Sequence, residues 1–229
     1  MTAVKICGIR RVKDALVAAE AGADLVGFVF AHSRRRIDPD AARDIVLEVK
    51  RQAEVKAVGV FVNESVHEMN RIARHCKLDL VQLSGDEPGD TAAALDLPAI
   101  QVLHVGRGET AVALERRAAR SDAQVLLLDT ARPGTHGGTG ETFGWETAQE
   151  LCAQRSVLLA GGLRPDNVVE AIRTAHPWGV DVSSGVERDG WKDAGLIREF
   201  VRAAKGTDAT VPAPRRCSGI VEQTISESA

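Results

Sequence analysis

Short apolar runs rich in β-branched residues alternate with longer amphipathic stretches along most of the chain. The runs have the length of strands, and the stretches between them have the spacing of helices that bury one face. This alternation is typical of a parallel sheet in which each strand is followed by a helix. We expect a helical stretch after every candidate strand, which gives eight strand–helix units. The candidate strands are residues 4–7, 25–30, 56–62, 78–83, 99–104, 124–129, 156–160 and 179–183.

Eight such units in 229 residues favour an α/β fold closed into a single-domain (βα)8 TIM barrel. An open doubly wound sheet is less consistent with the chain, because it lacks room for a second domain and has no Gly-x-Gly-x-x-Gly turn after the first strand. Residues 38–39 and 164–166 contain helix-starting signals, and residues 21–23 contain a helix stop. We expect residues 1–205 to form the catalytic barrel. Residues 206–229, with little apolar periodicity, are expected to form a flexible, disordered tail.

Composition and charge exclude several classes of protein. The net charge of −3 is spread without long single-sign runs, so bulk nucleic-acid binding is not expected. No basic segment with a long apolar stretch follows Met1, and no run approaches the ~18 apolar residues of a membrane span. The four cysteines lie far apart, without the spacing of a metal site or a disulfide framework. We therefore expect a cytoplasmic protein with reduced thiols and no membrane partner.

Two residues at strand ends carry candidate acid–base chemistry. Cys7 ends the first strand and shares a strand face with Lys5, a cation that lowers the pKa of a nearby thiol. Asp129 closes a long apolar run, where an unused and unpaired carboxylate would be costly. A buried structural thiol and a loop cap are the alternative roles. Barrel enzymes hold their active sites where the strands end, so Cys7 and Asp129 are expected to face each other across that opening.

Three glycine-rich or serine-rich segments resemble phosphate-binding loops. They are residues 137–140, 160–163 and 183–185, and the last two follow strands seven and eight. Barrel enzymes commonly bind phosphate there through backbone N–H groups. The first segment lies in the loop between Asp129 and Phe143, which is longer than most barrel loops and favours a mobile lid. The arginines at 34–36 follow strand two and form either a solvated cluster or a site for a substrate carboxylate.

Motifs distributed over residues 4–205 resemble the phosphoribosylanthranilate isomerases of tryptophan biosynthesis. Their order and spacing make the resemblance specific. The motifs are KICGI at 5–9, GFVF at 27–30, GVFVN at 59–63, VQL at 81–83, GDE at 85–87, LDT at 128–130, GGTG at 137–140, LAGGL at 159–163 with Asn167, and GVDVSSGVE at 179–187.

The resemblance implies an isomerase that needs no cofactor or metal and converts N-(5-phosphoribosyl)anthranilate to the aminoketose by an Amadori rearrangement. It implies that Cys7 is the general base, that Asp129 is the general acid, and that Arg35 contacts the anthranilate side. The substrate is a phosphorylated small molecule, and the chain is expected to be a monomer or a homodimer. Substrate-binding residues are expected at Arg35, Gln82, Gly138, Gly161, Gly162, Asp181, Ser183, Ser184 and Gly185.

The sequence departs from the family pattern at two positions. Ser84 stands where the family typically has His after VQL, and strand parity places it on the same inward face as Gln82. Arg34 stands between Ser33 and Arg35, where the family often has Pro or Lys. The alternatives are a dual-substrate or histidine-pathway phosphoribosyl isomerase and a non-catalytic phosphosugar-binding barrel. Cys7 argues against the former, because those isomerases usually carry Asp there, and the Cys7–Asp129 pair argues against the latter.

Overall fold

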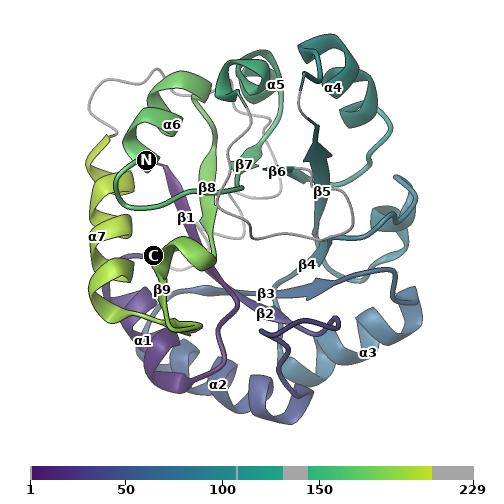
Figure 1. Ribbon diagram of the computed structural model, residues 1–229. Helices are drawn as coiled ribbons and strands as arrows, with labels where there is room; N and C mark the ends of the chain where they lie inside the picture. The colour runs from purple at the N-terminus through teal and green to yellow at the C-terminus, as the bar shows by residue number, and fades with distance from the viewer. Residues whose placement is uncertain (1, 107, 131–143, 208–229) are drawn as a thin grey trace.

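The computed structural model describes residues 2–106, 108–130 and 144–207. Eight parallel strands, hydrogen-bonded in sequence order, close into a barrel in which β8 pairs with β1 (Figure 1). The expected fold class and all eight expected strands are confirmed. The strands are β1 Ala3–Cys7, β2 Leu25–Val29, β3 Lys56–Phe61, β4 Leu80–Leu83, β5 Ala99–Val105, β6 Val125–Thr130, β7 Val157–Leu159 and β8 Gly179–Val182.

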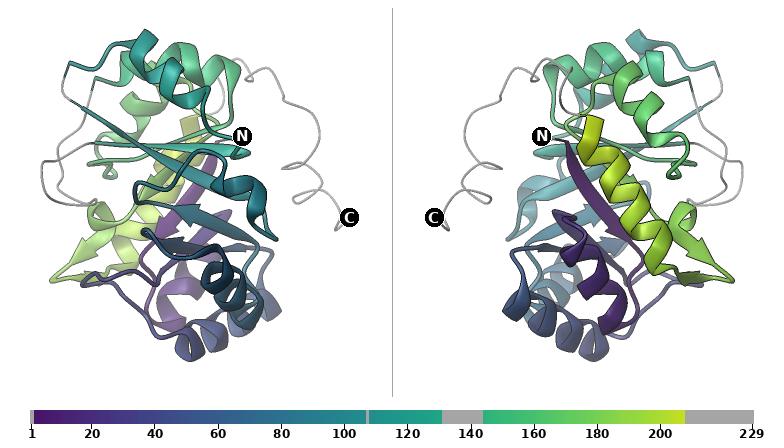
Figure 2. Two further views of the ribbon diagram at one scale, coloured as in Figure 1. Left: turned by 90° about the vertical axis from the view of Figure 1, so that its right-hand side faces the viewer. Right: turned by 90° about the vertical axis from the view of Figure 1, so that its left-hand side faces the viewer.

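Helices surround the barrel, and α7 lies along β1 beside α1 (Figure 2). None of the helices in the described ranges is long and apolar enough to cross a membrane. A short antiparallel hairpin of β9 Glu187–Arg188 and β10 Trp191–Lys192 lies between β8 and the last helix. The α-helices are α1 Val12–Glu20, α2 Pro39–Gln52, α3 Val66–Cys76, α4 Ala111–Ala118, α5 Gln149–Gln154, α6 Val168–Ala175 and α7 Ala194–Lys205, and the 3-10 helices are η1 Thr91–Ala94, η2 Trp145–Ala148 and η3 Ser184–Val186.

The segment after β4 is shorter than the expected helical stretch, because it holds only the single turn η1. Pro88 and Pro98 bracket this segment and leave few residues that can continue a helix. Gly89 packs against the end of the α4 region so closely that a Cβ atom there would lie 1.9 Å from the carbonyl oxygen of Arg120. The segment after β4 therefore packs directly against the backbone that follows α4.

The three expected helix boundaries are set in different ways. Asp38 caps α2 by accepting from the N–H of Asp40, with Pro39 as the first helical residue. Gly22, with a φ of 96°, ends the turn after α1 as expected. The helix start expected at residues 164–166 lies later, because residues 165–167 form a turn and α6 begins at Val168. In this turn the Asn167 side chain accepts from the N–H of Arg164 and donates to Gly162 O.

The core has two layers that follow the strand alternation. Inward-facing side chains fill the barrel itself, and outward-facing ones pack under the helices. At the amino-terminal end the packing is tight: a Cβ atom on Gly179 would lie 2.6 Å from Ala3 O and 2.8 Å from Leu158 Cδ2. The close contacts around Gly179 leave no space for a ligand there. The inward layer consists of Ala3, Leu25, Val58, Leu80, Ile100, Val102, Val125, Leu127, Leu158 and Ala160.

Polar side chains at the amino-terminal end join neighbouring strands in pairs, β1 with β2, β3 with β4 and β5 with β6. Asp24, just before β2, accepts from the N–H of Val4 at 2.7 Å, and Asp79, just before β4, accepts from Ala57 at 2.7 Å. Gln124, just before β6, accepts from Ala99 at 2.8 Å. Each bond satisfies a backbone donor at the start of the preceding strand, so this end of the barrel serves stability.

The last described residues still belong to the barrel. Lys205, at the end of α7, forms an ion pair with Asp24 at 2.6 Å, and Thr207 is buried and donates its hydroxyl to Ala203 O. The expectation of a flexible tail falls mainly on residues 208–229, which lie outside the described residues.

Replacing Gly179 by Val should lower the free energy of unfolding by about 2–3 kcal/mol, because the added methyl groups overpack the closed end of the barrel. Urea unfolding measures this difference. Gly206→Ala is the control, since its Cβ atom would meet nothing within 4 Å, and it should stay within about 0.5 kcal/mol of wild type. An unchanged Gly179→Val protein would contradict the close contact with β1.

Candidate active site

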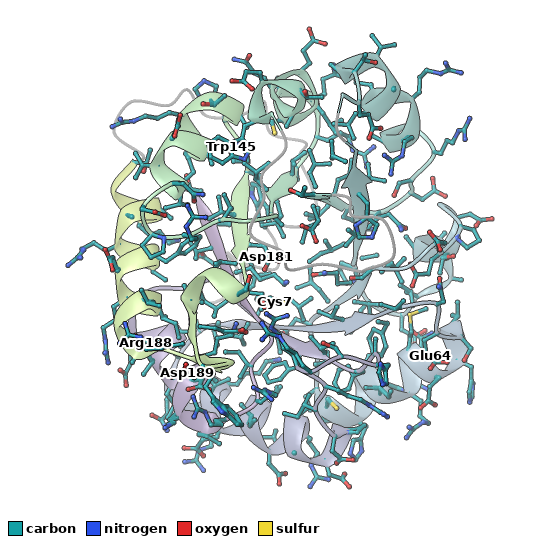
Figure 3. All side chains as sticks on the ribbon, in the orientation of Figure 1. Cys7, Glu64, Trp145, Asp181, Arg188 and Asp189 are labelled. Atoms are coloured by element: carbon teal, nitrogen blue, oxygen red, sulfur yellow. The ribbon has the colours of Figure 1, made fainter. Side chains whose placement is uncertain are left out.

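Cys7 lies beside a buried ion pair where the barrel closes. Lys5 of β1 is completely buried, and its Nζ atom is 2.9 Å from Oδ1 of Asp181 on β8. The same two residues are register partners in the β1–β8 ladder. Cys7 and Asp181 lie close together in the middle of Figure 3, on these neighbouring strands. The seam of the barrel, where β1 pairs with β8, therefore carries the thiol, an ammonium and a carboxylate.

Burial controls the ionisation of this group. It raises the pKa of the Cys7 thiol above its ordinary value, although Lys5 lowers it. For Lys5, burial lowers the pKa, but Asp181 and Cys7 outweigh that effect and raise it. The expectation that a neighbouring cation depresses the thiol pKa was therefore wrong in its net direction. Lys5 acts in that direction, but desolvation and the Asp181 charge oppose it.

Gly27 of β2 leaves the space that the thiol occupies. A Cβ atom at this position would lie 2.9 Å from Cys7 Sγ and 3.3 Å from Lys5 Nζ. We did not single out Gly27 as a site residue from the sequence. The available signal was a glycine inside an otherwise apolar strand, which often marks a close approach by another group.

Asp129 lies near the end of β6, on the same strand face as Val125 and Leu127 of the inward layer. Burial raises the pKa of its carboxyl from 3.8 to about 6, against the opposing influence of His104. His104, on β5, is its register partner. Such a carboxyl group holds a proton at higher pH than an ordinary aspartate, which suits a proton donor.

Gln82 and Ser84 share the inward face at the end of β4. Gln82 Nε2 donates to Ser84 Oγ at 3.0 Å, whereas Gln82 Oε1 is buried and has no hydrogen-bond partner among the described residues. A buried acceptor without a partner is costly, so a donor on a bound molecule would relieve that cost. His104 Nε2 lies 3.4 Å from Ser84 O, which places an imidazole from β5 next to Ser84.

Arg35 lies across the start of the loop after β1. A Cβ atom on Gly8, whose φ is 81°, would lie 2.6 Å from Arg35 Cδ, so only glycine admits the arginine stem. The guanidinium forms two hydrogen bonds with Glu187, from Nε at 2.6 Å and from Nη2 at 3.0 Å. The resemblance did not assign a role to Glu187, although the adjoining Asp189-Gly190 pair is a hairpin signal in the sequence.

The loops after β7 and β8 contact each other. Gly161 and Gly162 have φ values of 83° and 68°, and a Cβ atom on Gly161 would lie 2.4 Å from Thr130 Oγ1. Within the described residues, neither glycine N–H donates a backbone hydrogen bond. On the β8 side, a Cβ atom on Gly185 would lie 1.9 Å from Leu163 O, so Gly185 permits the contact between the loops.

The predicted serines have different surroundings. The hydroxyl of Ser183 donates to Cys7 O at 3.1 Å, and therefore joins the end of β8 to the end of β1. Ser184 starts η3. Gly138 lies outside the described residues, so its predicted role stays a prediction. Among the described residues, no group of three or more His, Cys, Asp or Glu side chains could hold a metal ion.

Comparisons with known proteins show to which family the chain belongs. Residues 4–203 match the family described as N-(5'phosphoribosyl)anthranilate (PRA) isomerase. The chain is 48% identical over 211 residues to the N-(5'-phosphoribosyl)anthranilate isomerase of Roseiflexus sp. (strain RS-1), covering 90% of this chain and 98% of the relative.

Two solved structures are similar over 90% of this chain and 100% of their own. One is a phosphoribosyl anthranilate isomerase in complex with reduced 1-(o-carboxyphenylamino)-1-deoxyribulose 5-phosphate, with 38% identity and a TM-score of 0.78. The other comprises monomers generated from the dimeric enzyme of Thermotoga maritima, also with 38% identity and a TM-score of 0.78. The chain belongs to the N-(5'-phosphoribosyl)anthranilate isomerase family.

Proposed function

We propose that the chain isomerises N-(5'-phosphoribosyl)anthranilate to 1-(2-carboxyphenylamino)-1-deoxyribulose 5-phosphate with Cys7 as general base and Asp129 as general acid. The observation that carries the proposal is the pair of inward-facing groups at the same end of the barrel. One is a thiol beside two lysines, and the other is a carboxyl group with a pKa of about 6. Family membership supports the reaction and its place in tryptophan biosynthesis.

The proposed reaction needs one proton donor and one proton acceptor. Asp129 protonates the furanose ring oxygen while the lone pair of the anthranilate nitrogen opens the ring, giving a protonated Schiff base. The Cys7 thiolate then removes the proton on C2', and the electrons of that C–H bond neutralise the Schiff base to give an enolamine. Tautomerisation of the enolamine forms the ketone. The oxidation of C2' is balanced by the reduction of C1' within the substrate, so the chemistry requires no external electron carrier.

The shifted pKa values determine which protonation state is active. In the form of the enzyme that can react, Cys7 and Asp129 carry one proton between them, with Cys7 as the thiolate and Asp129 protonated. Because the thiol pKa is raised and the Asp129 pKa is about 6, the more abundant state places that proton on sulfur. Lys5 favours the productive state, since its charge stabilises the thiolate. Asp181 keeps this ammonium in place.

Substrate groups are assigned to the remaining polar features of the opening. The N–H groups of Gly161 and Gly162, which donate to no described residue, suit the phosphate together with Ser184 and Gly185 of the adjoining loop. Arg35 suits the anthranilate carboxylate. Gln82 Oε1, which has no partner in the described ranges, suits a substrate N–H or O–H donor. Ser183 contributes by fixing the ends of β8 and β1.

We propose that the protein works in the cytoplasm as a monomer or homodimer. The free thiols of Cys7, Cys76 and Cys152 are compatible with a reducing compartment. The similar structure from Thermotoga maritima derives from an enzyme described as dimeric.

Cys7→Ala should lower kcat by about a thousandfold or more, because it removes the proton acceptor while keeping the phosphate and carboxylate contacts. Fluorescence-monitored turnover of the substrate and titration with the product measure the two effects separately. Product affinity and the melting temperature should stay close to wild type. Activity within about tenfold of wild type would exclude Cys7 as the base.

Asp129→Asn should reduce kcat much more than substrate affinity, because the amide cannot act as an acid. The same variant should be more stable than wild type at pH 7.5, by up to about 2 kcal/mol. The folded pKa of Asp129 is about 6 against an ordinary 3.8, so wild-type stability falls as pH rises through that interval. Urea unfolding at pH 5 and pH 7.5 measures this difference, and an equal change at both pH values would contradict it.

Gly162→Val should raise KM strongly, because a side chain at a φ of 68° strains the loop and obstructs the exposed N–H groups. Inorganic sulfate should compete with the substrate in wild type and compete more weakly in this variant. If sulfate inhibits both proteins equally while the variant loses activity, phosphate binds elsewhere and the glycines only turn the chain.

A further inference from the structure

Glu187 of β9 contacts several cationic side chains, whereas an ordinary surface ion pair joins one carboxylate to one cation. Its Oε1 atom accepts from Arg35 Nε at 2.6 Å and from Lys192 Nζ at 3.0 Å. Its Oε2 atom accepts from Arg35 Nη2 at 3.0 Å and from Arg34 Nη2 at 2.9 Å. The Glu187 side chain is only 6% exposed. One buried carboxylate therefore holds three cationic side chains.

The contact with Arg35 fixes the direction of its guanidinium. The stem of Arg35 passes over Gly8, immediately after Cys7, and the Arg35 side chain is 12% exposed. Glu187 occupies Nε and Nη2, and no hydrogen bond reaches Nη1 from the described residues. A bidentate contact restricts the plane of the guanidinium as well as its position. Arg35 is therefore held next to the Cys7 loop with one donor nitrogen available.

The hairpin makes this carboxylate rigid. Lys192 is the register partner of Glu187 across the β9–β10 pair, and its Nζ atom also donates to Ser183 O at 2.8 Å. Ser183 in turn donates its hydroxyl to Cys7 O. Glu187 is thus tied through Lys192 and Ser183 to the strand end that carries the proposed base. Burial raises the pKa of Glu187, but the bonds from Arg35 and Lys192 outweigh it and lower that pKa, so the carboxylate stays charged.

We propose that Glu187 is a positioning residue that holds Arg35 in the orientation needed to bind the substrate's aromatic carboxylate. Glu187 does not touch the substrate in this arrangement, and it acts through the guanidinium. The inference rests on the proposed function, because it assumes that Arg35 meets the anthranilate carboxylate. It adds the residue that determines where Arg35 points, and it makes the β9–β10 hairpin a part of the substrate-binding apparatus.

The Glu187→Gln variant tests this role. Its amide keeps the shape, but it loses the charge and one acceptor, so Arg35 gains freedom. We expect KM for the substrate to rise about tenfold, while kcat changes by less than about threefold. Glu68→Gln is the matched control, because Glu68 also forms a bidentate pair with an arginine, Arg71, on the exposed surface of α3. The control should leave both constants unchanged.

Two further measurements separate positioning from general structural support. In an Arg35→Met background, Glu187→Gln should cause no additional rise in KM. With the N-phosphoribosyl derivative of aniline, which lacks the carboxylate, Glu187→Gln and wild type should have equal KM values. A rise with this analogue, or an additive rise in the Arg35→Met background, would overturn the inference.

The outcomes also distinguish this inference from the proposed function. If wild type does not turn over the substrate, the proposed function fails. If wild type is active and Glu187→Gln has an unchanged KM, only the role of Glu187 fails. Should Glu187→Gln not fold, Glu187→Asp replaces it in the same series. That variant keeps the charge but withdraws it from Arg35 by one methylene, so the same rise in KM is expected.

Discussion

The ion pair between Lys5 and Asp181 is the interaction on which the active end of the barrel depends. It joins β1 to β8 where the sheet closes, and it places a completely buried ammonium beside the thiol of Cys7. Removing one partner of such a pair leaves an uncompensated buried charge, which is strongly destabilising. The pair therefore combines two roles. It completes the seam of the barrel, and it provides the charge that stabilises a thiolate in a poorly hydrated site.

Desolvation raises the pKa of both the proposed base and the proposed acid, but the consequences for the reaction differ. Burial makes the Cys7 thiolate harder to form and makes the Asp129 proton easier to retain. A protonated Asp129 is useful to the reaction, whereas a protonated Cys7 is not. The cations near the thiol offset part of that penalty, and Lys5 and Lys192 both lower its pKa. The arrangement keeps charged groups in fixed positions, so little reorganisation is needed during catalysis.

The amino-terminal end of the barrel contributes to stability, and the carboxyl-terminal end carries the groups proposed for binding and chemistry. At the amino-terminal end, Asp24, Asp79 and Gln124 satisfy backbone donors, and the inward layer is closely packed. At the carboxyl-terminal end, the N–H groups of Gly161 and Gly162 and the Gln82 Oε1 atom have no hydrogen-bond partner within the part of the chain that the structure describes. Unsatisfied groups of this kind reduce stability, so they are tolerated where a ligand can satisfy them.

The sequence by itself determined the barrel, because eight apolar runs at regular intervals admit few other arrangements. It also singled out Cys7 and Asp129 as candidates for acid–base chemistry, since polar residues that close apolar strands stand out against their surroundings. The tertiary structure alone decided the contacts that join distant segments: Gly27 with the thiol, Glu187 with Arg35, and Gly185 with Leu163. It also decided the net direction of the Cys7 pKa. Burial and the position of Asp181 depend on the closed fold, and neither can be obtained from the spacing of Lys5 and Cys7 along one strand.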